Sequence, residues 1–169
     1  VSYGLRVALA FAFFVISYWR LPILTSLQYL PGFWQFAPDA NVYHHCGSQI
    51  ASAWIAGASI PYIEGLGIEY FVVVAAAYTC LGSHPIMAVL VNCFLGTLSG
   101  LVAFAISRRL SDDERSAVVS AVLVAFWPST LIWSSQLLKD PLSLFLTLAV
   151  LLFILQACAA VRDLGRMRI

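Results

Sequence analysis

Charged residues are scarce in this sequence. Only 10% of its 169 residues are Asp, Glu, Lys or Arg, whereas 62% are hydrophobic, and the mean hydropathy is +0.91. A water-soluble domain of this size needs far more polar surface than this composition supplies, so the sequence predicts an integral membrane protein. The net charge is +1, and the chain has no basic stripe. Nucleic acid is therefore not an expected partner.

Paired cysteines are lacking as well. The chain has four cysteines, namely Cys46, Cys80, Cys93 and Cys158. They show neither a C-x-x-C pattern nor another spacing typical of a metal site, and at least three lie in apolar runs, so we expect them to pack as small apolar side chains. The neighbours His44 and His45 would point about 100° apart on a helix. They cannot close on one metal ion by themselves, so no metal site is predicted from them.

Long apolar runs are the feature that the chain has in abundance. A bilayer-spanning helix needs roughly 20 apolar residues, or fewer with charged flanks. Four runs meet this criterion, at residues 5–19, 85–106, 117–133 and 141–161. A fifth run, Leu66–Gly82, carries Glu69 and is bounded by glycines. It is either a further span or a juxtamembrane helix in the membrane interface.

We expect the interfacial alternative, and the basic residues then set the orientation of the chain. With four spans, seven of the nine basic residues fall on one side, namely Arg6, Arg108, Arg109, Arg115, Arg162, Arg166 and Arg168. Arg20 and Lys139 fall on the other. Because cytoplasmic loops are enriched in Lys and Arg, this division predicts cytoplasmic termini and a large external loop at about residues 20–83. A crossing by Leu66–Gly82 would also divide the basic residues seven to two, with Arg6 and Lys139 against the other seven, and stays an open alternative.

Two aspartates then lie on the external side. Pro38 and Asp39 are typical of a helix start, and Tyr43 follows one turn later on the same face. Asp140 immediately precedes Pro141 at the start of the last span. Each carboxylate has a structural interpretation as a helix cap. Carboxylates are also common general acids and bases, so the pair equally suits a catalytic site.

Three segments together resemble a known family. "PDANVYHHCGSQIASAW", "YTCLGSHPIMAVLVNCFLGTLSGLVAFAISRRL" and "AFWPSTLIWSSQLLKDPLSLFLTLAVLL" are similar, in order, spacing and topology, to the N-terminal module of the GT-C superfamily. These membrane glycosyltransferases use polyprenyl-phosphate-linked sugars and include protein O-mannosyltransferases and the lipid A aminoarabinose transferase. The resemblance covers about Phe33 to Leu155. One departure is that Asp39 is followed by Ala40, where the O-mannosyltransferases have an acidic pair.

The resemblance implies roles for particular residues. Asp39 takes the place of the first-loop acid, which acts as catalytic base or positions one. Asp140 and Lys139 match the second-loop pair, near the donor phosphate and the catalytic cavity. Tyr43 and His44 match polar, substrate-binding positions after the first acid. The family mostly requires no cofactor, although its oligosaccharyltransferase branch holds a divalent metal ion with acidic residues, and the two aspartates could do either.

The resemblance also implies the overall function. Residues 1–169 would form a single membrane domain, the N-terminal part of a longer multi-pass transferase of the cell (inner) membrane, and would be inactive alone. The activity would be transfer of a sugar from a polyprenyl-phosphate donor to a glycan, lipid or protein acceptor on the extracytoplasmic face. The alternatives are a structural or inactive membrane subunit, in which both acids are caps, and a transporter fragment. A transporter would be expected to show intramembrane charges or broken helices.

Overall fold

The structure is a computed structural model in which residues 1–59 and 69–166 are described. Their order is α1 (Ser2–Tyr18), the 3₁₀ turn η1 (Thr25–Leu27), α2 (Asp39–Ile55), α3 (Glu69–Leu81), α4 (Pro85–Ser111), α5 (Glu114–Phe126), α6 (Pro128–Ser134) and α7 (Asp140–Arg166). The described residues form no β-strand, apart from one isolated bridge between Gln28 and Trp34. The predicted all-helical class is confirmed.

Two helices are long and apolar enough to cross a membrane. They are α4 and α7, the latter over Asp140–Arg162, and α5 with α6 makes a third if this pair, bent by 51°, is one broken span. The predicted count of four spans is not confirmed. The helix α1 has 17 residues, about 26 Å at 1.5 Å per residue, which is short of a hydrocarbon core of about 30 Å.

The predicted span 117–133 is broken at Pro128. Proline has no N–H for the carbonyl of Val124, four residues earlier, so the α-helix stops at Phe126 and restarts as α6. The Thr130 hydroxyl donates to the orphaned Val124 carbonyl at 3.0 Å. The break is therefore specified locally by the sequence.

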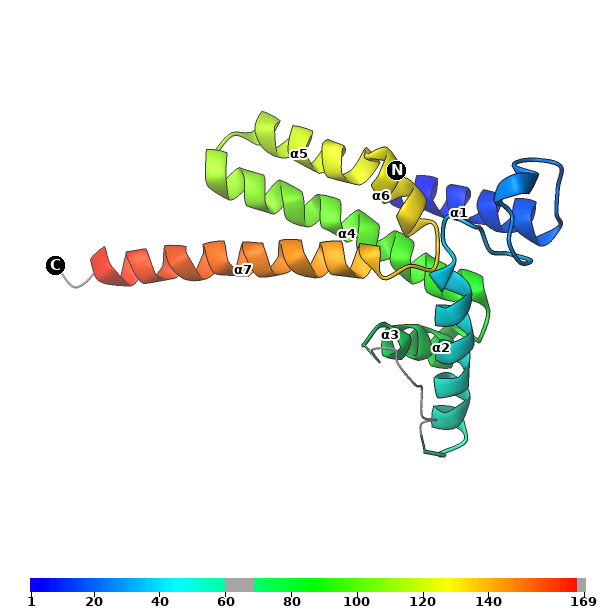
Figure 1. Cartoon of the computed structure of the whole chain (residues 1–169). Helices are drawn as coiled ribbons and strands as arrows, with labels where there is room; N and C mark the ends of the chain where they lie inside the picture. The colour runs from blue at the N-terminus through cyan, green and yellow to red at the C-terminus, as the bar shows by residue number, and fades with distance from the viewer. Residues whose placement is uncertain (60–68, 167–169) are drawn as a thin grey trace.

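The helices form two groups. Figure 1 shows α4, α5 and α7 side by side, whereas α2 runs across them near the start of α4. The fifth apolar run corresponds to α3, whose 13 residues extend about 20 Å, too short for a span. Residues 66–68 of that run lie outside the described residues. The length of α3 agrees with the interfacial alternative.

Small residues allow close helix packing. A Cβ added to Gly47 of α2 would lie 2.5 Å from Val74 Cγ1 of α3, and one added to Gly100 of α4 would lie 3.0 Å from the Ala125 Cβ of α5. This agrees with the general role of small residues in helix contacts.

The predicted packing of the cysteines holds for Cys46 and Cys93, which are buried, but is wrong for Cys80 and Cys158, which are exposed.

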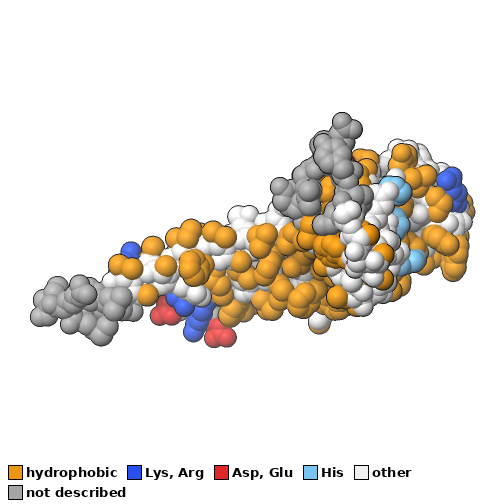
Figure 2. All heavy atoms as spheres, turned by 90° about the horizontal axis from the view of Figure 1, so that it is seen from below, with side chains coloured by type: hydrophobic (Ala, Val, Ile, Leu, Met, Phe, Trp, Pro, Cys, Tyr) orange, Lys and Arg blue, Asp and Glu red, His pale blue; other side chains and the backbone are white. Residues whose placement is uncertain are grey.

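The buried core lies at one end of the molecule. It joins α2, α3 and the first half of α4, with Ile50, Phe71, Val74, Tyr78 and Cys93 among its members. In contrast, the apolar window of α7 is 0% buried. Figure 2 shows apolar side chains over most of the visible face, with the visible charged groups toward its two ends. This distribution is the one expected for helices surrounded by lipid.

Candidate functional site

Asp39 and Asp140 occupy equivalent positions, each at the first residue of its helix. Asp39 begins α2, and Asp140 begins α7. Both side chains are exposed. The cap interpretation of Asp39 is not realised, because the N-cap residue is Pro38 and α2 has no side-chain cap hydrogen bond. The Asp39 carboxylate instead lies in the first turn, where the helix dipole favours a negative charge.

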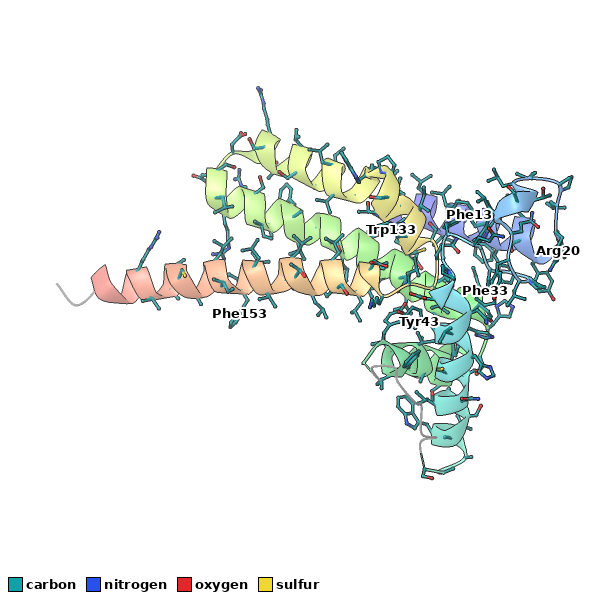
Figure 3. The ribbon with its side chains drawn as sticks, viewed as in Figure 1. Phe13, Arg20, Phe33, Tyr43, Trp133 and Phe153 are labelled. Atoms are coloured by element: carbon teal, nitrogen blue, oxygen red, sulfur yellow. The ribbon has the colours of Figure 1, made fainter. Side chains whose placement is uncertain are left out.

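Both carboxylates act electrostatically on Tyr43. This side chain is buried, with 9% of its surface exposed, and in Figure 3 it extends from α2 toward α3 and the start of α7. Desolvation by burial raises the pKa of the Tyr43 phenol, and the negative charges of Asp39 and then Asp140 raise it further. A charge acts more strongly on a nearer group. Both acids, far apart in sequence, thus lie within electrostatic range of one tyrosine.

A buried amide fixes this arrangement. Asn92 of α4 donates through Nδ2 to the carbonyls of Gln136 and Leu138, at 2.8 and 2.7 Å. Its Oδ1 accepts from the Tyr70 hydroxyl at 3.0 Å. The Tyr70 ring in turn packs edge-on against Tyr43, with 4.7 Å between centroids. One side chain therefore links the tyrosine pair to the segment that leads into α7.

No role for Asn92 is predicted in the sequence analysis. The sequence does offer one indication: a single amide in the apolar run 85–106 must find hydrogen-bond partners inside the protein, because lipid offers none.

His44 and Lys139 lie at the edge of this arrangement. A ring nitrogen of His44, Nδ1, is 2.8 Å from the Tyr78 hydroxyl, and its ring is 5.9 Å from that of Phe33. Burial lowers the pKa of His44, and the neighbouring His84 and His45 lower it further. His44 is therefore neutral at pH 7. Lys139 is exposed and directly precedes Asp140.

A cavity of about 260 Å³ opens beside Asp140. It lies between α4, α6 and α7, and its lining residues are Gly96, Ser129, Thr130, Trp133, Ser134, Asp140, Pro141 and Leu144. The volume is just below the roughly 300–1,000 Å³ typical of small-molecule sites. Three hydroxyl side chains and one carboxylate face a mostly apolar wall. Such a cavity suits a small polar group attached to an apolar one.

Arg6 forms the support behind this cavity. Its side chain is fully buried. The guanidinium donates to the Thr130 carbonyl at 2.8 Å, the Ala125 carbonyl at 2.6 Å and the Ser134 hydroxyl. A Cβ on Gly96 would lie 2.8 Å from Arg6 Nη1, so only glycine leaves room for the guanidinium there.

This position of Arg6 corrects the sequence-based topology. Arg6 was counted among the cytoplasmic cations that flank the spans. It lies instead against Gly96 of α4, and Arg108 follows twelve residues later on the same helix, about 18 Å away along the axis. Burial among backbone carbonyls, rather than contact with the cytoplasm, satisfies its charge. The other six arginines of that group are unaffected by this correction.

The described side chains contain no group of three His, Cys, Asp or Glu residues that could hold a metal ion. The expectation that no cofactor is required stays a prediction.

The fold and this site define an all-helical chain with two helices, or three with the broken pair, able to cross a membrane. Comparison with known proteins finds no matching family model, no matching curated protein and no matching solved structure.

Proposed function

We propose that this chain is the N-terminal module of a GT-C-like glycosyltransferase. It would transfer a sugar from a polyprenyl-phosphate donor to an acceptor hydroxyl or amine on the extracytoplasmic face of the membrane. The observation that supports this most is the cavity between apolar helices that Asp140 lines, together with the electrostatic influence of both Asp39 and Asp140 on Tyr43. A lipid-linked donor needs such a cavity within reach of the bilayer.

The proposed chemistry assigns one role to each acid. Asp39, as general base, removes the proton from the acceptor as its oxygen or nitrogen bonds to the anomeric carbon of the sugar. The bond from that carbon to the donor phosphate breaks, and the polyprenyl phosphate departs with the electron pair. Asp140, at the cavity, orients the acceptor through hydrogen bonds.

Two further residues complete the proposal. Lys139 is exposed next to Asp140, and its cation would stabilise the charge that develops on the leaving phosphate. Tyr43 keeps its proton, since its pKa is raised, and its hydroxyl can act as a donor to the sugar. His44, neutral and bonded to Tyr78, would support the wall of the site.

The test is sugar transfer by the full-length protein that contains this chain, measured in liposomes with a polyprenyl-phosphate sugar. Asp39→Asn is nearly isosteric and preserves the start of α2, yet it removes the base. We expect a loss of about 10²–10⁴-fold in rate, the usual contribution of general base catalysis. Asp140→Asn should reduce transfer as well, with unchanged expression and membrane insertion.

Glu114→Gln is the matched control. Glu114 is an exposed acid in the first turn of α5, whereas the cavity residues Ser129 and Thr130 follow the other end of that helix. Full activity of the Asp39→Asn protein would contradict the catalytic assignment. A structural or inactive subunit, the alternative, predicts that both Asn variants behave like this control.

A further inference from the structure

The connection between α1 and α2 carries an unusual surface. Within residues 18–30, called here the 18–30 loop, seven large apolar side chains are each 37–68% exposed. They are Tyr18, Trp19, Ile23, Leu24, Leu27, Tyr29 and Leu30. A run of large exposed apolar groups marks a surface that contacts something other than water.

Two polar side chains in or beside the 18–30 loop bond to its backbone. The Gln28 amide donates through Nε2 to the carbonyls of Leu21 and Ile23, at 2.8 and 2.9 Å. The Ser17 hydroxyl lies within 3.1 Å of the Leu30 carbonyl and 2.7 Å of the Phe33 carbonyl. Arg20, Thr25 and Ser26 are exposed as well. The loop therefore presents large apolar groups together with a few polar ones, whereas a surface loop in water presents mainly polar side chains.

The backbone holds this arrangement at a cost. Arg20 and Leu24 adopt φ values of 49° and 52°, in the left-handed region that residues with a Cβ enter only at an energetic penalty. Behind them, Trp34 is fully buried and donates from Nε1 to the Phe13 carbonyl at 3.1 Å. Backbone outliers held by such surroundings often indicate a functional constraint.

The loop lies at the edge of a candidate span. The rings of Phe14 in α1 and His84 at the start of α4 are 5.2 Å apart, so the last turn of α1 is level with the start of α4. Figure 1 shows the loop after α1, past that level. Because α4 is long and apolar enough to cross a membrane, its start marks the region of the lipid headgroups.

We propose that the 18–30 loop inserts into the headgroup region of the bilayer and binds phospholipid. Trp and Tyr side chains are enriched at this depth, which Trp19 and Tyr29 would occupy. Leu24 would reach the acyl chains, while Arg20 extends to a lipid phosphate. No acidic residue precedes Asp39 in the chain, so nothing in this segment repels an anionic headgroup. The proposal does not depend on the sugar chemistry.

The test compares the intact chain with its Trp19→Phe variant in phosphatidylcholine vesicles that contain phosphatidylglycerol. Tryptophan emission is quenched either by brominated acyl chains or by aqueous iodide. Trp19 is exposed and its replacement by Phe keeps the apolar surface, so folding should persist, and circular dichroism checks this. We expect the variant to lose a component of emission that brominated lipid quenches and iodide does not.

Trp54→Phe is the control for removing a partly exposed tryptophan on α2, where no such loss is expected. Quenching of the Trp19 component by iodide would show that the loop lies in water, and protection from both quenchers would show that protein covers it. Either result overturns the proposal. Arg20→Gln tests the phosphate contact separately: the Trp19 component should become less accessible to brominated lipid in vesicles with phosphatidylglycerol, and an unchanged component would remove Arg20 from the proposal.

Discussion

Replacing Arg6 should destabilise the fold more than replacing any exposed arginine. In Arg6→Met, the carbonyls of Ala125 and Thr130 and the hydroxyl of Ser134 lose their donor. Three bonds to a charged donor, at about 1.5–3 kcal/mol each, give roughly 5–9 kcal/mol. Removing a buried charge returns several kcal/mol of desolvation free energy. We therefore expect a net loss of about 3 kcal/mol in the free energy of unfolding.

Gly96 offers a way to test the contact itself. A Cβ at this position would lie 2.8 Å from Arg6 Nη1 and 3.0 Å from Ser134 Cβ. Gly96→Ala should therefore cost about 1–3 kcal/mol, the usual penalty of overpacking. In the Arg6→Met background, part of this clash disappears because a flexible thioether replaces the planar guanidinium. The double variant should be less unstable than the sum of the two single changes.

The assay is equilibrium unfolding in detergent micelles, followed by circular dichroism. Arg109→Met is the control, since Arg109 is exposed near the end of the same helix α4, and it should change stability by no more than about 0.5 kcal/mol. If Arg6→Met were as mild as this control, the buried guanidinium would not hold α5 and α6. Strict additivity of Arg6→Met and Gly96→Ala would likewise contradict the direct contact.

Two other changes have clear expected outcomes. Gly47→Ala should destabilise the protein by about 1–3 kcal/mol in thermal unfolding, because its Cβ would lie 2.5 Å from Val74 Cγ1. Gly4→Ala is the control and should not destabilise the protein, because a Cβ at Gly4 would have nothing within 4 Å. Hydrogen bonds from the side chain and amide of Ser116 lower the pKa of Asp113 below its unfolded value of 3.8. A lowered folded pKa gives stability that is present above pH 3.8 and is lost as the pH falls below it. Asp113→Asn keeps the helix cap but has no carboxylate to protonate. When the free energy of unfolding is measured against pH, the variant should therefore lose less stability in acid than the unchanged protein, and an equal loss would contradict the role of Asp113.

The sequence predicted the helices better than their relation to a membrane. Apolar runs identified α4 and α7 because spans of this length depend on local composition alone. The start of α2 at Asp39 followed from the preceding proline. Hydropathy predicts a continuous helix over 117–133, but Pro128 lies within this run and removes one helical hydrogen bond. Average hydropathy does not register the loss of a single backbone donor.

The candidate site was predictable only in part. The same-side placement of Asp39 and Asp140 follows from four spans, with Leu66–Gly82 in the interface, and the structure places Arg6 inside the protein rather than at a flank. The influence of both acids on Tyr43 depends on where α2 lies relative to the start of α7, which no local pattern encodes. Arg6 was misplaced because the positive-inside rule treats every arginine as a flank, whereas a buried one is held by carbonyls that only the fold brings near.

The placement of Asp140 depends on polar groups in helices other than its own. The break at Pro128 exposes carbonyls at the end of α5, and Arg6 of α1 binds the one at Ala125. The segment from Gln136 to Leu138, which has no regular structure, gives two carbonyls to Asn92 of α4. Buried acceptors of this kind are costly unless they are bonded, so each donor fixes its segment strongly. A carboxylate on the first residue of α7 is thereby held at the cavity from two sides. Any chemistry at Asp140 thus rests on α1 and α4 as much as on α7.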